Sequence, residues 1–290
     1  MAHRHLIPPM QKLPTARGEI AYRRFGNPEG PKVLALHGWL DNHSSFIPLA
    51  PFLSELDLIA IDLPGHGSSY HRSDFNTYYF IEWLIDLAEV LTLLGWKRPT
   101  LLGHSLGGAI ATVWAGTFPE TVGNLLLIES LGPLADPANL APQTVQEFLR
   151  QSQRLPSQRS VIYENLETVI ALRQKATPLT ASSARLLLEN SMIKTDSGWV
   201  WKSDPRCRFT SALRFTPEQV LAFIHQITCP TLVVIADDGL KLSSQEQAQR
   251  EKAWQRLEKR SVPGHHHVHM DTPERVAPLL VEFLNSIKKG

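Results

Sequence analysis

Short apolar segments alternate with amphipathic helical segments along most of the chain. Five apolar runs are brief, uninterrupted and bounded by Gly, Pro, Asp or Asn, a pattern typical of strands buried on both faces of a mostly parallel sheet. These runs are residues 33–36, 58–61, 100–102, 125–128 and 231–235. Ahead of them, residues 13–26 have the pattern of an antiparallel hairpin with Gly18 in its turn. A hairpin followed by strand–helix repeats predicts a three-layer α/β domain.

A helix is predicted between the second and third of these runs. Its apolar positions recur at helical spacing and comprise Phe80, Trp83, Leu84, Leu87, Leu91 and Leu94. Glu82, Asp86 and Glu89 occupy the opposite face. We interpret these three carboxylates as a solvated helix face rather than as acid–base groups.

The alternation stops between Gly132 and Phe215. This part contains three amphipathic stretches, at residues 143–151, 165–176 and 181–192, followed by an aromatic segment at 198–209. An all-helical insertion between two strands of an α/β sheet is most simply a cap over one edge of the sheet. The predicted organisation is a core formed by residues 1–131 and 216–290, with a helical cap formed by residues 132–215.

Composition and charge narrow the function classes. The 290 residues are 43% hydrophobic, which is enough for a substantial core, and 29 Lys and Arg against 28 Asp and Glu give a net charge of +1. Without a basic block, nucleic acid is an unexpected partner. No segment has the length and apolarity of a signal peptide or a membrane span, which favours the cytoplasm. The two cysteines, Cys207 and Cys229, are expected to be reduced and packed.

A candidate nucleophile lies directly after the third apolar run. The sequence GHSLG at 103–107 has the form G-x-S-x-G and is followed by a helical pattern from Ala109. Between a strand and a helix, this motif predicts a strained turn that presents the hydroxyl of Ser105, with Gly103 and Gly107 avoiding clashes. The backbone N–H of Leu106, at the start of the helix, is positioned to stabilise an oxyanion.

Taken with other motifs, this turn resembles the α/β-hydrolase superfamily over essentially the whole chain. The supporting segments are HGW at 37–39, DLPGHGSS at 62–69, GHSLG at 103–107 and PGHHHVHMDTP at 263–273. Within the superfamily, the segments at 37–46, 128–134 and 199–206 are similar to the serine-hydrolase-like branch, which is related to haloalkane dehalogenases. The resemblance implies an α/β-hydrolase fold, and it implies that Trp39, the residue after the His-Gly pair, supplies the second oxyanion N–H. Dehalogenases and epoxide hydrolases have Asp where this chain has Ser105, so both chemistries are disfavoured.

Four histidines near the C-terminus compete for the role of general base. The superfamily pattern places the base seven residues before a Pro that opens the final helix, and this register selects His266 because Pro273 follows at that distance. His265, His267 and His269 are then bystanders that pack or form hydrogen bonds. Adjacent residues do not easily converge on one ion, so we predict no metal site in this run and no cofactor.

The third member of a triad departs from the common pattern. The superfamily usually has an Asp at the position of Gly239, after the apolar run 231–235, so Asp237 or Asp238 would need a shift in register. Some related dehalogenases place the acid after the preceding strand, where this chain has Glu129. We rank Glu129 first, followed by Asp238 and then Asp237.

The sequence therefore predicts a serine hydrolase that cleaves a small ester-like acyl substrate through an acyl-enzyme. A C–C bond or amide hydrolase of the same fold is an alternative, because the choice depends on the pocket. A non-catalytic ligand-binding protein that kept the fold is a second alternative. Four aromatic residues are candidates for an acyl pocket, namely Trp39, Trp199, Trp201 and Phe209. Substrate identity and oligomeric state stay open.

Overall fold

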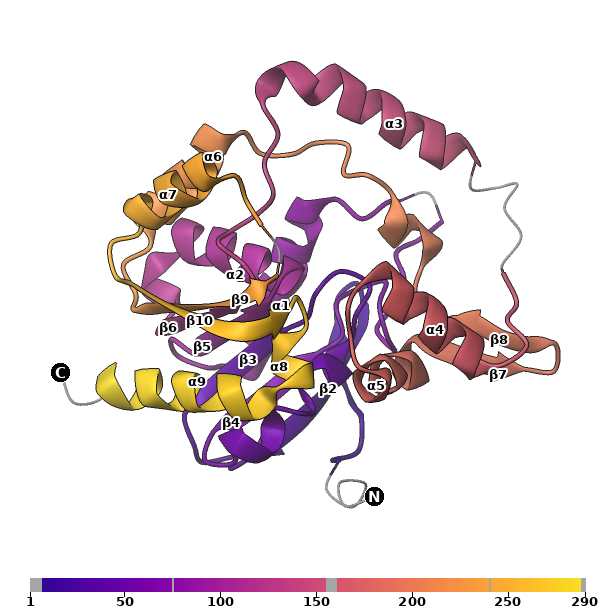
Figure 1. The fold of residues 1–290 in the computed structure, drawn as a ribbon, viewed down its shortest axis with the longest axis horizontal. Coiled ribbons are helices and arrows are strands. Elements are labelled where there is room, and N and C mark those ends of the chain that lie inside the picture. The colour runs from indigo at the N-terminus through magenta and orange to yellow at the C-terminus, as the bar shows by residue number, and fades with distance from the viewer. Residues whose placement is uncertain (1–6, 75, 155–160, 240, 288–290) are drawn as a thin grey trace.

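The computed structural model describes residues 7–74, 76–154, 161–239 and 241–287. Its centre is an eight-stranded sheet with the order β1-β2-β4-β3-β5-β6-β9-β10 (Figure 1). The strands are β1 Gln11–Thr15, β2 Gly18–Gly26, β3 Lys32–Leu36, β4 Asp57–Ile61, β5 Thr100–His104, β6 Asn124–Ile128, β9 Thr231–Asp238 and β10 Leu257–His265. All five apolar runs and the predicted N-terminal hairpin are confirmed as strands of this one sheet.

The first three strands in spatial order are antiparallel and the remainder of the sheet is parallel. β1 pairs with β2 and β2 pairs with β4 in antiparallel register, whereas β4, β3, β5, β6, β9 and β10 pair in parallel. Parallel strands all end at the same edge, so the residues that follow β3, β5, β6 and β10 meet there. The predicted site residues belong to these four connections.

Helices cover both faces of the sheet, as the three-layer prediction requires. One face packs against α1 Phe80–Leu94, α2 Leu106–Thr117, α6 Pro217–Gln226 and α7 Ser244–Ala253. The other packs against α9 Pro273–Ile287 and the short 3-10 helices His43–Phe46 and Ala50–Leu53, while α8 Val268–Asp271 leads into α9. Alternate residues of β3 point into the two layers, with Leu34 and Leu36 on one side and Val33 and Ala35 on the other.

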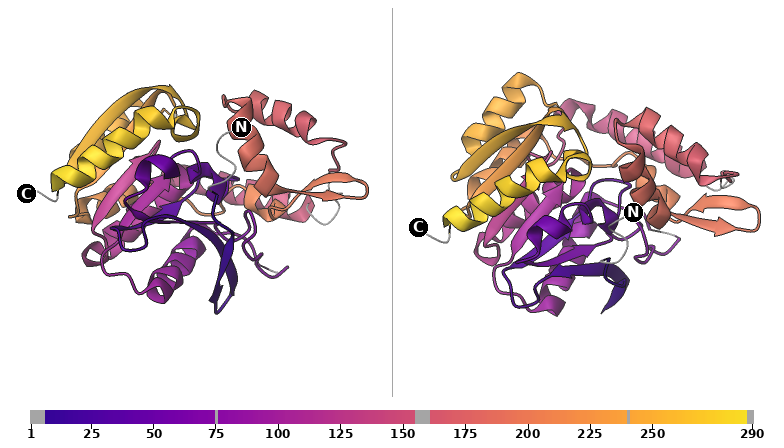
Figure 2. Two further views of the ribbon diagram at one scale, coloured as in Figure 1. Left: turned by 90° about the horizontal axis from the view of Figure 1, so that it is seen from below. Right: turned by 60° about the horizontal axis from the view of Figure 1, so that its bottom comes forward.

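The inserted segment forms a separate layer beside the core, but it is not all helical as predicted. It contains α3 Ala141–Arg154, α4 Leu166–Ala176, α5 Ala181–Ser191 and a hairpin of β7 Met192–Thr195 and β8 Gly198–Trp201. Figures 1 and 2 show this hairpin projecting away from the core beyond α4 and α5. Each strand has only four residues, too few for a two-residue period to be distinguished in the sequence.

The prediction of a solvated carboxylate face on α1 is wrong for Asp86. This carboxylate is buried, accepts a hydrogen bond of 2.6 Å from Arg72 Nη2 and accepts another of 2.7 Å from Tyr70 Oη. A buried carboxylate requires such partners. The partners come from the loop before α1, and helical periodicity carries no information about them.

Two other sequence expectations concern cysteines and membrane spans. Cys207 and Cys229 are free thiols in buried positions, which confirms the prediction of packed, unpaired cysteines. Within the described ranges, every helix is too short or too polar to cross a membrane.

Candidate active site

Ser105 occupies a strained turn between β5 and α2. Its backbone has φ 50° and ψ −112°, a region that non-glycine residues rarely adopt and that costs about 1–3 kcal/mol. The turn is tight because glycines flank it. A Cβ added to Gly103 would lie 2.4 Å from the Cα of Gly108, and one added to Gly107 would lie 1.9 Å from the carbonyl oxygen of Leu36. The predicted steric need for glycine at both positions is confirmed.

His266 follows β10 immediately and faces a carboxylate. Its Nδ1 lies 3.0 Å from Glu129 Oε2. A carboxylate accepts but does not donate, so Nδ1 carries the proton and Nε2 keeps a lone pair. The backbone carbonyl of His266 lies 2.9 Å from His104 Nε2, which donates to it. These two contacts hold the ring and the main chain of His266.

Glu129 is buried directly after β6. Its backbone has a positive φ of 54°, and its Oε1 accepts a hydrogen bond of 2.5 Å from the backbone N–H of Ala236 in β9. A Cβ added to Gly239 would lie only 2.0 Å from Oε2. The carboxylate of Glu129 therefore fills the space that a side chain at position 239 would need.

The two rival acids lie elsewhere. Asp237 and Asp238 are both exposed at the end of β9, and Asp238 is opposite His265 in the ladder with β10. Among the three carboxylates considered from the sequence, the structure brings Glu129 to His266.

The loop after β3 carries the second candidate oxyanion donor, Trp39. His37 holds this loop, because its Nε2 accepts from the backbone N–H of Leu63 at 2.9 Å and its Nδ1 donates to the carbonyl of Gly38 at 2.7 Å. The indole Nε1 of Trp39 donates to the carbonyl of Cys207 at 2.6 Å, which ties the loop to the inserted segment. The indole side chain itself is 52% exposed.

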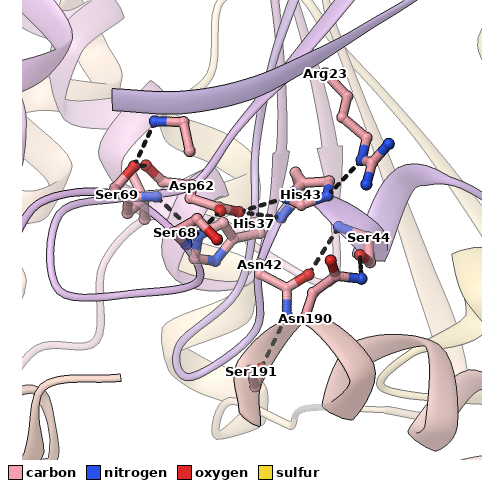
Figure 3. A network of polar contacts seen from close by, with 12 residues as sticks. Arg23, His37, Asn42, His43, Ser44, Asp62, Ser68, Ser69, Asn190 and Ser191 are labelled. Atoms are coloured by element: carbon pink, nitrogen blue, oxygen red, sulfur yellow. Dashed lines mark hydrogen bonds and ion pairs between the residues drawn. The ribbon is translucent and has the colours of Figure 1, made fainter. Parts of the chain in front are cut away.

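A network of polar contacts includes His37 and Asn42 of this loop (Figure 3). Asp62 accepts from the backbone N–H and the Nδ1–H of His43, both at 2.7 Å, and the Nε2 of His43 accepts from Arg23 Nε at 2.9 Å. Burial alone would raise the pKa of Asp62, but the contacts with His43 and His37 lower it to about 2. Asp62 is therefore ionised near pH 7 and accepts these hydrogen bonds as a carboxylate.

The same loop is joined to the cap. Asn42 Nδ2 donates to Ser191 Oγ at 2.9 Å, and Asn190 Nδ2 donates to Ser44 Oγ at 2.7 Å (Figure 3). These contacts connect the 3-10 helix after β3 with the end of α5. The cap therefore has fixed hydrogen bonds to the core beside the site.

Ser105 and His266 line one cavity of about 480 Å³ between the core and the cap. The core contributes Gly38, Trp39, Leu40, Asp41, His104, Ser105, His266 and His267, and the cap contributes Tyr163, Val169, Leu172, Arg173, Ala176, Thr177, Trp201 and Arg208. Two of the four predicted pocket aromatics, Trp39 and Trp201, are therefore at the cavity. Trp199 packs beside the apolar cluster of the cap, and Phe209 contacts Phe148 with ring centroids 6.0 Å apart.

A buried polar group that the sequence does not predict lines the same cavity. Asp41 Oδ2 is 3.0 Å from His267 Nε2, and Asp41 Oδ1 is 3.1 Å from Nη2 of Arg173 in α4. Burial opposes ionisation of Asp41, but His267 and Arg173 hold the pKa of its carboxyl well below the usual range. Burial lowers the pKa of His104 to about 4, so that ring is neutral near pH 7. No local signal in the sequence connects Arg173 to Asp41.

The remaining histidines of the C-terminal run differ in exposure. His265 is exposed, while His267 and His269 are buried. The Nε2 of His269 lies 2.7 Å from Ser45 Oγ. The two buried rings therefore make hydrogen bonds within the core.

Comparison with known proteins supports the same architecture. Residues 31–273 match the family described as alpha/beta hydrolase fold. A probable serine hydrolase from Drosophila melanogaster is 34% identical over 283 residues, covering 92% of this chain and 85% of the relative. A serine hydrolase-like protein from Danio rerio is 30% identical over 284 residues, covering 94% and 87%.

A solved structure is also similar over nearly the full length. The hypothetical protein PA1622 from Pseudomonas aeruginosa PAO1 superposes with a TM-score of 0.90 at 33% identity, covering 95% of this chain and 99% of that protein. Fold, motifs and relatives agree, and the chain belongs to the alpha/beta hydrolase fold family, as a hydrolase of the serine-hydrolase-like branch.

Proposed function

We propose that this protein cleaves an ester-like acyl substrate through a covalent acyl-enzyme on Ser105. One observation carries the proposal: Ser105, in a strained left-handed turn, shares a cavity with His266, whose Nδ1 contacts the buried carboxylate of Glu129. A nucleophile, a base and a carboxylate that orients the base are the three parts of a serine-hydrolase triad. No metal or cofactor is needed for this chemistry.

The first half of the reaction transfers the acyl group to the enzyme. The oxygen of Ser105 attacks the ester carbonyl while its proton passes to Nε2 of His266. Glu129 stabilises the imidazolium that forms and keeps Nδ1 protonated. The tetrahedral intermediate then expels the alcohol, which takes the proton from Nε2.

The second half returns the enzyme to its starting state. His266 removes a proton from water, the resulting hydroxide attacks the acyl-enzyme, and the carboxylic acid leaves as Ser105 regains its proton. In both halves the negative oxygen is stabilised by the backbone N–H groups of Leu106 and Trp39. Leu106 supports this role because it begins α2, where the first N–H groups have no acceptor inside the helix.

The two alternative functions considered from the sequence would use the same cavity in different ways. A C–C bond or amide hydrolase would use the same Ser105 and differ only in the substrate that the cap admits. A ligand-binding protein without activity would need no orientation of His266, whereas the 3.0 Å contact to a buried carboxylate supplies it. The proposed partner is therefore a small acyl compound, and the buried free thiols fit the proposed cytoplasmic location.

A chain-length series of p-nitrophenyl esters tests the proposal. We expect turnover of at least one member, and a slowly hydrolysed member should leave an acyl adduct that mass spectrometry maps to Ser105. Turnover with the adduct on another residue would contradict the assignment. Turnover of amides or C–C substrates in place of esters would select the alternative chemistry.

Glu129→Gln is expected to reduce ester turnover by at least a hundredfold. Glutamine preserves the shape of the side chain but removes the charge that stabilises the imidazolium, a loss that costs roughly 10⁴ in a serine protease. Asp237→Asn and Asp238→Asn are the matched controls, because both carboxylates are exposed at the end of β9. Near-normal turnover in a folded Glu129→Gln variant, with a large loss in Asp238→Asn, would return the acid to the usual strand.

The space shared by Glu129 and position 239 allows the acid to be moved. In Glu129→Gly/Gly239→Asp, the new carboxylate enters the volume that Glu129 vacates, and glycine tolerates the positive φ at 129. We expect the double variant to be at least tenfold more active than Glu129→Gly alone. Gly239→Asp alone should lose activity, because two carboxylates then compete for one space. Equal rates for the double variant and Glu129→Gly, with both folded, would contradict this arrangement.

A further inference from the structure

In the wall of the active-site cavity, Asp41, His104 and His267 bring three ligand atoms close to one another. Asp41 Oδ2 lies 3.0 Å from His267 Nε2 and 3.6 Å from His104 Nδ1, and all three ligand atoms lie within 4.8 Å of one another. Tetrahedral zinc with ligands at about 2.0–2.2 Å needs ligand atoms roughly 3.3–3.5 Å apart. The distances of 3.0 Å and 3.6 Å from Asp41 Oδ2 bracket that spacing.

His104 presents an unused lone pair to this group. Its Nε2 donates to the carbonyl oxygen of His266 at 2.9 Å, and a carbonyl only accepts, so the proton of the neutral ring is on Nε2. Nδ1 is therefore unprotonated, and it has no hydrogen-bond partner among the described residues although it is fully buried. A buried lone pair that faces a carboxylate oxygen is unfavourable unless a cation lies between them.

We propose that Asp41, His104 and His267 bind a divalent transition-metal ion such as Zn²⁺, and that this ion inhibits the enzyme. The site uses only His267 from the C-terminal histidine run, so it is distinct from the arrangement of adjacent histidines that the sequence argued against. One carboxylate and two imidazoles leave one tetrahedral position for water. That water has access, because all three residues also line the cavity.

Arg173 competes with the metal for Asp41. Its Nη2 is 3.1 Å from Asp41 Oδ1 and 3.3 Å from His267 Nε2, so a guanidinium stands beside the site in the metal-free protein. The metal displaces the proton on His267 Nε2, and the ring then carries its proton on Nδ1. The side chain of Arg173 is 19% exposed and leaves toward the cavity when the metal enters.

Inhibition follows from charge. The His104 and His266 rings have centroids 4.8 Å apart, so the metal adds positive charge near the imidazole that becomes cationic when Ser105 loses its proton. Like charges at close range in a buried site oppose that step. This inhibitory effect rests on the proposed function, whereas binding of the metal does not.

Binding is tested first, with Co²⁺ and Zn²⁺ on the 290-residue chain. Co²⁺ should give the intense visible absorption of a tetrahedral ion, and Zn²⁺ should abolish it at one equivalent. Anomalous scattering at the zinc edge from soaked crystals should place the ion between Asp41, His104 and His267. Absence of zinc from that position, or the same Co²⁺ spectrum from His267→Gln, would overturn the proposal.

Variants then separate this site from adventitious binding. His267→Gln should weaken Zn²⁺ binding at least tenfold, whereas the exposed neighbour variant His265→Ala should bind as the wild type does. Arg173→Met removes the competing cation and should bind Zn²⁺ more tightly. Weaker binding of Zn²⁺ by this variant would contradict the site.

If ester turnover is measurable, Zn²⁺ should inhibit it and a chelator should restore it. If Zn²⁺ binds tightly at this site but does not inhibit ester turnover, the inhibitory role is refuted and the metal site stands. If Zn²⁺ binds tightly but the protein hydrolyses no ester, the result counts against the proposed function and not against the metal site.

Discussion

Ser105→Ala is expected to reduce ester turnover to background while leaving the protein folded. The substitution removes the nucleophilic oxygen, and loss of the serine from a comparable triad lowers kcat by roughly 10⁶. The backbone strain at φ 50° is unchanged by alanine, so the melting temperature should stay close to that of the wild type. The measurement is p-nitrophenyl ester turnover, with circular dichroism to check the fold.

Ser68→Ala is a suitable control for Ser105→Ala, because Ser68 lies outside the residues that line the cavity. It should retain turnover within a fewfold of the wild type. If Ser105→Ala hydrolysed esters as fast as the wild type, Ser105 would not be the nucleophile.

His266→Ala is the second variant with a very large expected effect. Without the imidazole at the Glu129 contact, no base accepts the proton of Ser105, and the rate should fall by roughly the same 10⁶ as for the serine. His265→Ala is the matched control, because His265 is the last residue of β10 and is exposed to solvent. It should keep most of the activity.

His267 is a poor control for His266→Ala. Its ring is buried and hydrogen-bonded to Asp41, so alanine there removes a buried polar contact and is expected to lower the melting temperature. A register error would appear as loss of activity in a folded His267→Ala variant while His266→Ala stayed active. That pattern would contradict the assignment of the base.

The nucleophile turn was predictable because its cause is local. Gly103, Ser105 and Gly107 lie within five residues of one another, and the steric requirement for glycine arises from the turn and from β3 directly beside it. The apolar runs predicted the strands for a similar reason, since burial on both faces leaves a continuous signal in the sequence.

The position of Glu129 was predictable only by resemblance to relatives. What the sequence could not supply was the reason for Gly239, which is that a side chain there would overlap the Glu129 carboxylate. The two residues are far apart in sequence and meet because β6 and β9 are neighbours in the sheet. The absence of an Asp at position 239, after β9, is therefore explained by the Glu129 side chain that follows β6.

Contacts between the cap and the core were not predictable at all. Arg173 of α4 donates to Asp41 of the core at 3.1 Å, and this pairing follows no periodicity along the chain. The hairpin β7–β8 was missed because its strands are short. These contacts depend on how residues 132–215 fold back onto the core. The pattern of apolar and polar residues within a short stretch of sequence does not determine that.

Reaction of the protein with a fluorophosphonate probe tests most directly whether Ser105 is an activated nucleophile. Such a probe modifies a serine only when a neighbouring base activates it, whether or not the natural substrate is known. We expect one probe per chain, mapped by mass spectrometry to Ser105, and much slower labelling of His266→Ala. Failure of the folded wild-type protein to label at Ser105 would contradict the proposed triad and would favour a ligand-binding role for the cavity.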